Sequence, residues 1–489
     1  MADEHTALLP PGKDNEAGHI KGLLPPNSAV EVISRSETWI LLRATRTIAI
    51  TQLLEWSLYS VSVFLLGHLG TKYLAASTIS LVTFNVLGIS LSVGFSGALD
   101  TLCPHSWASH PKETSLHAQR MLFMLLSLAI VQCLVMSLAA EKIFLFLRQG
   151  EEISYLAAKY LRVQGFAIFP MIVFEVLRKY LQSMNLMRAP AIVIACIAPI
   201  NIVLSYLLVS GPVEALRIGY LGTPISYLIT SSLSAGLLAA YAGMHAREGH
   251  TGFTARALTN FGQMTKLGLA SLAQTVSEWW TWEAIFLMSS QLGADYLASM
   301  SVCIATATLL YQLPMSLNIA ASVRVGNLLG AERPDLAKVS AKTSMIISVL
   351  IGVFSAIVIF SLRNQWGRVF ASDPEVIEIV ANSLPLVSAF QVFDCLAGVT
   401  AGVLRGAGLP WIGAWLNVVC LLGIGVPLGG VLCFTAHLKI NGLWLGASVA
   451  LFLSATAGTI IVNRIRWEDH VNIVQREGLT EPDASESQA

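Results

Sequence analysis

The residue with the clearest capacity for chemistry is a glutamate in the middle of an apolar segment. Glu278 lies in the stretch SLAQTVSEWWTWE (residues 271–283), within an apolar region of about residues 267–291. A charge in the hydrocarbon of a bilayer is costly, so such residues are usually functional. Apolar surroundings favour the protonated form of a carboxylate, so Glu278 could hold a proton near neutral pH. It could release that proton when hydrated or paired with a cation, which is what a proton-coupled transporter requires.

A helix would place Glu278 on a continuous polar stripe. The other members of the stripe are Ser271, Gln274, Thr275, Thr281 and Trp282. Lipid cannot satisfy polar groups, so the stripe must face protein or water. The alternative interpretation is a glutamate hydrogen-bonded between helices for packing, although no Lys or Arg lies within two helical turns to neutralise it.

Three tryptophans, Trp279, Trp280 and Trp282, flank this glutamate. Tryptophan in membrane helices usually marks the lipid–water interface, but Trp279 and Trp280 are too deep in the segment for that role. An aromatic wall beside a carboxylate suits an organic cation, through cation–π attraction and charge. Ordinary core packing is the competing explanation for each tryptophan.

A second acid, Asp394, lies about two-thirds of the way along the apolar segment 378–403. Gln391 is one turn earlier on the same helical face. The nearest basic residue in the sequence is Arg405, three turns away, so no local salt bridge explains the acid. We therefore predict that Asp394 has a functional role beside Glu278.

Two further acids, Glu55 and Glu175, are secondary candidates. Glu175 is followed at i+3 and i+4 by Arg178 and Lys179, a spacing that favours a structural salt bridge. Glu55 is in mid-segment without a basic neighbour in sequence. It could be a second titrating site or a structural residue.

The composition indicates which elements position these side chains. Of 489 residues, 54% are hydrophobic and only 12% charged, against about 25% charged in a typical soluble domain. This predicts a protein with many membrane spans, each of which needs about 20 apolar residues. The twelve candidates are residues 46–67, 73–102, 120–141, 155–182, 189–210, 217–243, 266–290, 296–322, 341–362, 378–403, 410–434 and 440–463.

Charge and cysteine usage exclude other classes. The formal net charge of zero argues against a nucleic-acid-binding protein. The seven cysteines contain no CxxC pair, so neither a disulfide framework nor a zinc site is expected. No nucleophile–base pair or nucleotide loop is present, so we expect neither an enzyme nor a cofactor.

The two halves of the sequence resemble each other. Residues 68–78 align with 291–301 at a shift of 223, and the same shift carries Glu55 onto Glu278. Later the register slips to 219, which carries Glu175 onto Asp394. A repeat of six spans predicts two lobes related by a pseudo-two-fold axis along the membrane normal, with the site between them.

The predicted fold is therefore an all-α membrane protein with 12 transmembrane helices in two pseudo-symmetric six-helix lobes. The expected divisions are a disordered cytoplasmic N-tail (1–42), an N-lobe (43–243), a cytoplasmic linker (244–265), a C-lobe (266–466) and a cytoplasmic C-tail (467–489). The distribution of Lys and Arg places both termini in the cytoplasm. A monomer in the lipid bilayer is expected.

Several longer motifs carry a family resemblance. They are Gly67-HLGT, Tyr73-LAAS, Ala98-LDTLCP, Phe174-EVLRKYLQS, Ser277-EWWTWEA, Ile319-AASVRVGNLLGAE and Phe393-DCLAGVTAGVLRGAGL. With these motifs the chain resembles the MATE (multidrug and toxic compound extrusion) transporters of the eukaryotic type, over about residues 46–466. The resemblance implies a V-shaped cleft between two lobes. It also implies efflux of organic cations, xenobiotics or secondary metabolites in exchange for protons, with Glu278 and Asp394 as the ion-handling pair and sodium as the less expected coupling ion.

One functional alternative stays open, a lipid-linked or oligosaccharide flippase of the same wider superfamily. Those relatives often have 14 spans and a basic cavity, so twelve spans and acidic residues favour the antiporter. The membrane is also open. Leu8 and Leu9, preceded by Glu4, resemble an acidic dileucine signal for a vacuolar or lysosomal membrane, and the plasma membrane is the alternative.

Overall fold

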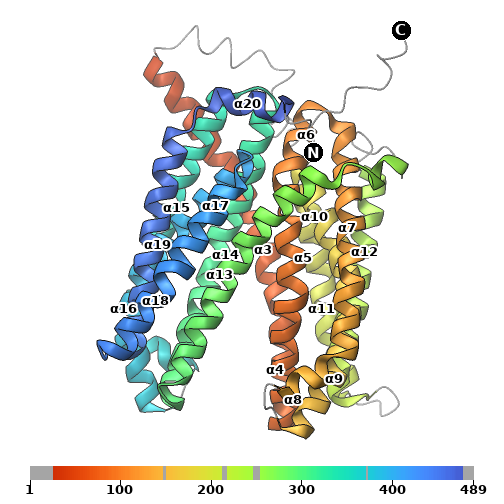
Figure 1. The fold of residues 1–489 in the computed structure, drawn as a ribbon, viewed down its shortest axis with the longest axis vertical. Helices are drawn as coiled ribbons and strands as arrows, with labels where there is room; N and C mark the ends of the chain where they lie inside the picture. Colours follow the sequence, from red (N-terminus) through yellow and green to blue (C-terminus); the bar gives the residue numbers. More distant parts are fainter. Residues whose placement is uncertain (1–25, 147–149, 212–216, 246–253, 371–372, 477–489) are drawn as a thin grey trace. The chain divides into compact units, whose positions relative to one another are not determined.

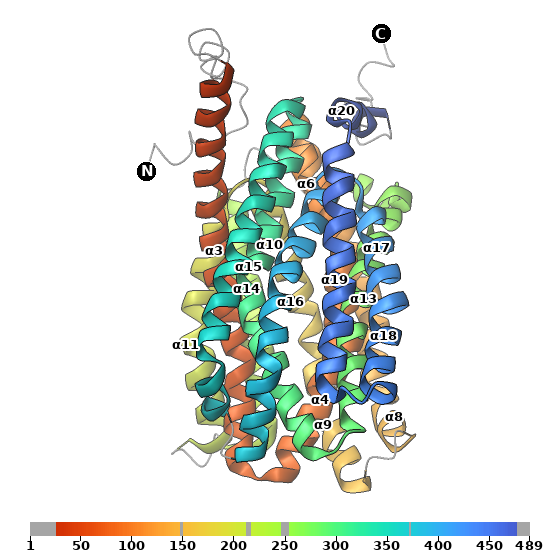
Figure 2. The same ribbon diagram turned by 90° about the vertical axis from the view of Figure 1, so that its left-hand side faces the viewer.

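The computed structural model describes residues 26–146, 150–211, 217–245, 254–370 and 373–476, and Figures 1 and 2 show them as a helical assembly. Within these ranges the chain forms helices and no strands. Leu8 and Leu9 of the sorting motif lie outside the described residues. The all-α prediction is therefore confirmed for the part of the chain that the structure describes.

The described residues form twelve long helical segments, in agreement with the predicted number of spans. Among the described residues, nine helical runs are long and apolar enough to cross a membrane, and a tenth run is bent by 41°. Helices α3 and α13 complete the predicted set. In chain order the spans are α3 (Pro26–Leu69), α4 to α6 (Thr71–Phe84, Ser90–Ser96 and Leu99–Ser109), α7 (Pro111–Leu138), α9 with α10 (Glu151–Phe166 and Ile168–Ser183), α11 (Arg188–Ser210), α12 (Gly222–His245), α13 (Phe261–Ser290), α14 (Ala294–Gly330), α15 (Pro334–Phe370), α16 (Pro374–Gly406), α17 with α18 (Pro410–Asn417 and Val426–Gly430) and α19 (Lys439–Arg464).

Short elements join or interrupt these spans. Two π-helical stretches, η6 (Val418–Gly425) and η7 (Val431–Thr435), lie before and after α18, and a third, η1 (Asn85–Ile89), separates α4 from α5. The remaining elements are α8 (Ala140–Phe146), the 3-10 turns η3 (Gly219–Leu221) and η5 (Ala255–Leu258), and α20 (Trp467–Arg476). Such π-bulges widen the helix locally and often occur at functional sites.

The helices form two compact units. The N-unit contains Ile50–Cys103 and His110–Leu272, and the C-unit contains the described residues up to Ala49, Pro104–Ser109 and those from Ala273 onward. These boundaries differ from the lobes expected at 43–243 and 266–466. The start of α3 belongs to the C-unit because Arg324 donates to Glu37 at 2.6 and 3.1 Å.

Helix extends into both predicted tails, and the disorder predicted for residues 1–42 is wrong from Pro26 onward. Helix α3 begins at Pro26, within the segment 1–42, and Glu37 and Leu41 are buried there. Helix α20 begins at Trp467, within the segment 467–489, and packs against α14 and α15 with Trp467 buried. In both places a few apolar residues on one face of a polar helix are enough to dock it.

The internal repeat is visible in the backbone. Gly70 precedes α4 with φ 134°, and Gly293, 223 positions later, precedes α14 with φ 113°. Side chains rarely tolerate this conformation, so both halves use glycine at the same turn. Asn185 after α10 and Gly408 after α16 are also left-handed and also 223 positions apart.

The second pair of turns corrects the register predicted for the fourth span. Counted back from Asn185 and Gly408, the counterpart of Asp394 is Met171, and the counterpart of Glu175 is Gly398. The shift of 219 therefore pairs the wrong residues, because it follows a local likeness one helical turn out of phase with the turn that ends the helix.

Candidate functional site

The two acids predicted to act together line one cavity of the C-unit. Glu278 comes from α13 and Asp394 from α16, and the cavity has a volume of about 40 Å³. Its other lining residues are Gln274, Trp282, Tyr311, Asn318, Ala397, Gly398, Ala401, Arg405, Asn417, Leu421 and Leu451. We call it the acid cavity.

A cation and a phenol accompany the acids. Tyr311 lines the cavity beside the acids, and the Arg405 guanidinium attracts the Glu278 carboxylate. Arg405 is held by Asn318, whose Oδ1 accepts from Nη2 at 2.6 Å. Packing therefore brings Arg405 into the cavity of both acids, although it is three helical turns from Asp394 and far from Glu278 in the sequence.

The spacing of residues in the sequence could have predicted that Arg405 lies on the same helical face as Asp394. Asp394, Gly398, Ala401 and Arg405 follow each other at intervals of four, three and four residues, which places them on one face of α16. The small residues between the two charges leave room for the cavity. At Gly398 an added Cβ would lie 3.2 Å from the Tyr311 hydroxyl oxygen.

Gln274 also lies in the acid cavity, as predicted. Its side chain is buried, and its backbone oxygen accepts from Asn417 Nδ2 at 3.4 Å. Within the described residues, Gln274 Oε1 has no hydrogen-bond partner. A buried acceptor of this kind needs a water molecule or ligand, so the cavity suits a polar occupant.

Only one of the three tryptophans faces the cavity. Trp282 lines it and packs against Phe390 and Trp444, with ring centroids 5.4 and 5.7 Å away. Trp280 is 54% exposed on the outer surface of α13, and Trp279 does not line the cavity. The predicted aromatic wall is therefore reduced to Trp282 and Tyr311, because Trp279 and Trp280 project from other faces of the helix.

Gln391 is the remaining predicted residue of the C-unit. It is fully buried and does not line the acid cavity. Its Nε2 donates to Cys395 Sγ at 3.9 Å. Gln391 is one turn from Asp394, as the sequence indicates, but its side chain is buried between helices and does not reach the cavity.

The size of the acid cavity limits its contents. One buried water needs a cavity volume of roughly 10–15 Å³, so the acid cavity, with 40 Å³, has room for about three waters. A proton, a small ion or water fits, and an organic cation does not. With both acids ionised and Arg405 protonated, the three side chains carry one net negative charge.

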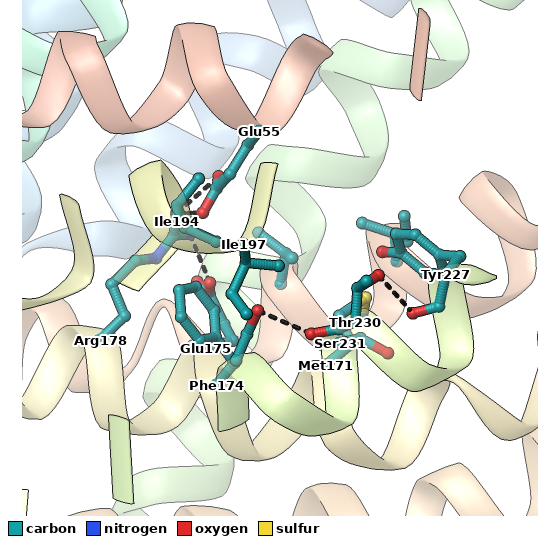
Figure 3. A pocket seen from close by; sticks show the side chains of 13 residues that line it. Glu55, Met171, Phe174, Glu175, Arg178, Ile194, Ile197, Tyr227, Thr230 and Ser231 are labelled. Carbon is teal, nitrogen blue, oxygen red and sulfur yellow. Dashed lines mark hydrogen bonds and ion pairs between the residues drawn. The ribbon is translucent and has the colours of Figure 1, made fainter. Parts of the chain in front are cut away.

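The secondary candidates Glu55 and Glu175 line a larger cavity of the N-unit, of about 170 Å³ (Figure 3). Arg178 lies between them, as the dashed lines in Figure 3 show. Its Nη1 donates to the Glu55 oxygens at 3.0 and 3.1 Å. We call this the N-unit cavity.

These ion pairs confirm one prediction and correct another. The predicted salt bridge of Glu175 is present, with Arg178 and with Lys179 at 3.8 Å. Lys179 also pairs with Asp100 at 2.7 Å. Glu55, in contrast, does have a basic partner, because Arg178 reaches it from another helix.

The two cavities occupy equivalent positions in the two halves. At the shift of 223, Glu55 corresponds to Glu278 and Ile194 to Asn417, and each of these four residues lines its own cavity. The fourth spans agree as well. Met171, Phe174, Glu175 and Arg178 line one cavity, and Asp394, Ala397, Gly398 and Ala401 line the other.

Comparison with a protein-family model identifies the family of the chain. The MatE model matches the chain twice, over residues 47–207 and 270–431, and the two matches begin 223 positions apart. The chain belongs to the MATE family of transporters. The repeat seen in the sequence and in the backbone is therefore the family's own repeat.

Several transporters resemble the chain along most of its length. An uncharacterized transporter of Schizosaccharomyces pombe is 34% identical over 90% of this chain and 82% of its own length. Multidrug and toxin extrusion protein 2 of Mus musculus is 30% identical, covering 92% of this chain and 77% of its own length. The crystal structure of the eukaryotic MATE transporter AtDTX14 matches with a TM-score of 0.85 and 26% identity, over 92% of this chain and all of that one.

Proposed function

We propose that this MATE transporter is an antiporter that exports small organic cations in exchange for protons. The observation that carries the proposal is the placement of Glu278 and Asp394 in one small cavity inside the C-unit. The name of the mouse relative, a multidrug and toxin extrusion protein, supports organic compounds as the exported class.

The charge of the acid cavity explains how protons would be handled. With Arg405 charged, one bound proton brings the three ionisable side chains from a net charge of −1 to zero. A neutral buried site is much less costly than a charged one. Proton binding would therefore stabilise a closed, dehydrated state of the cavity, and proton release would favour a hydrated one.

Exchange of an organic cation for a proton follows if the cation compensates the same net negative charge of the acid cavity. A cation near the deprotonated acids stabilises them, and a proton on either acid removes that attraction. Each ligand then lowers the affinity for the other, which is the reciprocal coupling that antiport needs. We expect alternating access, in which protons load from the outer side and leave on the inner side.

Reconstituted proteoliposomes test this function. The measurement is efflux of a fluorescent organic cation under an imposed pH gradient, and separately under an imposed sodium gradient. We expect the pH gradient alone to drive efflux, and Glu278→Gln and Asp394→Asn each to abolish it. Glu283→Gln is the matched control, since it makes the same change five residues along α13 at an exposed position.

Three results would contradict the function. Wild-type coupling in Glu278→Gln would exclude that acid from proton handling. Efflux driven by a sodium gradient but not by a pH gradient would show that sodium, and not the proton, is the coupling ion. If no organic cation moves and lipid-linked sugars do, the flippase alternative takes its place.

A further inference from the structure

We infer that the N-unit cavity is a second cation site, which binds a small amphipathic organic monocation on Glu55 while Arg178 stays paired with Glu175. The transport function proposed above supplies only the class of ligand, an organic cation. The location, size and charge of the site come from the N-unit itself.

The first reason is the size and lining of the cavity. Its volume of about 170 Å³ is four times that of the acid cavity, and an engineered apolar cavity of about 150 Å³ binds benzene. Most of its wall is apolar, and the apolar members are Ile89, Val93, Met171, Phe174, Ile194 and Ile197. A monocyclic molecule therefore fits the N-unit cavity and does not fit the acid cavity.

The second reason is the charge at one end of this apolar wall. Two carboxylates, Glu55 and Glu175, share the single guanidinium of Arg178. Glu55 is the more accessible partner, with 26% of its side chain exposed against 8% for Glu175. Both carboxylates line the cavity, and the more exposed Glu55 is the one that a cationic ligand can contact more fully.

Exchange of partners at Glu55 leaves no buried charge uncompensated. When a ligand cation takes the Glu55 carboxylate, Arg178 keeps its contact with Glu175. Breaking a buried ion pair is costly mainly because one charge is left alone, and here neither charge is. The arrangement thus permits a cation to enter at low cost.

Aromatic side chains add to the attraction for a cation. Phe174 and Tyr227 both line the cavity, and Figure 3 shows Tyr227 at the opposite end from Glu55. A ligand with an ammonium group at Glu55 would place its apolar part among these rings, and aromatic faces also attract cations directly. A neutral molecule of the same shape would gain only the apolar contacts.

The third reason is the equivalence of the two cavities. Glu55 occupies the repeat position of Glu278, and both cavities are lined by the same turns of the fourth span. The second-half cavity has Gly398 and Ala401 where the first half has Glu175 and Arg178. Glu55 therefore lies beside a cavity, as Glu278 does, and its partner Arg178 can be replaced there by the cation of a ligand.

Binding of benzylammonium, with benzyl alcohol as its neutral isostere, tests the site. Dissociation constants are measured by saturation-transfer NMR on the full chain in nanodiscs of uncharged lipid. We expect wild type to bind benzylammonium at least about tenfold more tightly, the gain expected from a charge-assisted hydrogen bond. Glu55→Gln should lose that preference, and the exposed control Glu283→Gln should keep it.

A second variant decides the matter if Glu55→Gln folds poorly. Ser231→Phe leaves every charge in place and fills the cavity that Ser231 lines, so it should abolish binding of both probes. Unchanged binding in Ser231→Phe, or an unchanged preference in Glu55→Gln, overturns the site. Loss of the preference in Glu278→Gln instead of Glu55→Gln would move the ligand to the acid cavity and also overturn it.

Failure of this site is distinguishable from failure of the transport function. The NMR measurement needs no ion gradient, so it reports binding even if the pH gradient drives no efflux. Conversely, proton-driven efflux that depends on Glu278 can hold while Glu55→Gln binds benzylammonium like wild type.

Discussion

Two glutamates at equivalent positions have different neighbours, and the neighbours decide what each can do. Glu55 shares Arg178 with Glu175 at ion-pair distance. Glu278 faces Tyr311 and Asp394, with Arg405 held by Asn318. Each glutamate shares its cavity with a second acid and an arginine, but Arg178 is ion-paired with Glu55, whereas Arg405 is held by Asn318.

The hydrogen bond between Arg405 and Asn318 gives a prediction at the residue scale. Asn318→Ala removes a buried acceptor of a charged donor, which should lower the free energy of unfolding by about 1.5–3 kcal/mol. Thermal unfolding in detergent measures the effect. Gln312→Ala is the control, because it removes an exposed hydrogen bond to Thr308 on the same helix.

The control should shift the free energy of unfolding by no more than about 0.5 kcal/mol. Equal shifts for Asn318→Ala and Gln312→Ala would show that the 2.6 Å contact contributes nothing to the stability of the C-unit.

Sequence reasoning at this scale found the acids and missed their partners. Glu278 and Asp394 were identifiable because a charge in an apolar segment is conspicuous by itself. Arg405 and Asn318 meet across 87 positions of the chain, and Arg178 reaches Glu55 across 123. Such pairings depend on how helices pack, which the local spacing of charges does not contain.

At the scale of elements, α14 and α16 approach closely at small residues. A Cβ added to Gly402 would lie 2.5 Å from the Asn318 backbone oxygen and closer still to its Oδ1. A Cβ on Gly406 would also contact the Ser322 backbone oxygen. Small residues at such crossings allow membrane helices to pack backbone against backbone, and here they hold Asn318 and Arg405 together.

This crossing gives a prediction with an internal control. Gly402→Ala should lower the free energy of unfolding by about 1–3 kcal/mol, because it overpacks the contact. Gly236→Ala on α12 has nothing within 4 Å of its new Cβ and should be neutral or stabilising by up to about 1 kcal/mol. Thermal unfolding of both variants, with proton-driven efflux as a second readout, checks the contrast. A Gly402→Ala protein as stable as the Gly236→Ala protein would mean that the helices can separate without cost.

The elements themselves were largely predictable. The twelve predicted apolar segments appear as twelve helical segments among the described residues. Length and hydropathy identify nine of them, or ten with the bent pair, and α3 and α13 complete the set. The helices of the tails, α20 and the start of α3, were not predicted. They are polar overall and are ordered by docking, as the buried Glu37 and Trp467 show. The π-helical stretches were also unforeseen, because apolar periodicity does not distinguish them from α-helix.

At the scale of the whole molecule, the first helix is tied to the second half of the chain. Glu37 and Arg324 are 287 positions apart and form a two-point ion pair, with side chains 3% and 13% exposed. Exposed ion pairs contribute little to stability, but this pair is buried, so loss of either partner would affect the free energy of unfolding. It anchors the start of α3 to the end of α14 within the C-unit.

Breaking this pair from one side should be costly. Glu37→Ala leaves the Arg324 charge uncompensated and should lower the free energy of unfolding by about 3–5 kcal/mol. The double variant Glu37→Leu/Arg324→Met should recover most of the loss. Glu152→Ala is the control, because it removes the exposed Lys72–Glu152 pair and should cost less than about 1 kcal/mol.

Thermal unfolding of the three variants in detergent gives the comparison. If the double variant is as unstable as Glu37→Ala, the loss comes from packing around α3 and not from an unpaired charge.

The paired turns at Gly70 and Gly293 bear on the history of the protein. Two glycine turns of positive φ, separated by the same 223 positions as Glu55 and Glu278, indicate a duplicated unit with one such glutamate beside a cavity in each copy. Duplication supplied a spare copy, so one could change without loss of the original activity. The copy with Gly398 and Ala401 has the smaller cavity, in which Arg405 is held by Asn318, whereas the other copy has the larger cavity, in which Arg178 pairs with both acids. One unit, used twice, thus provides two sites of equal formal charge that differ in volume and in the contacts of the arginine.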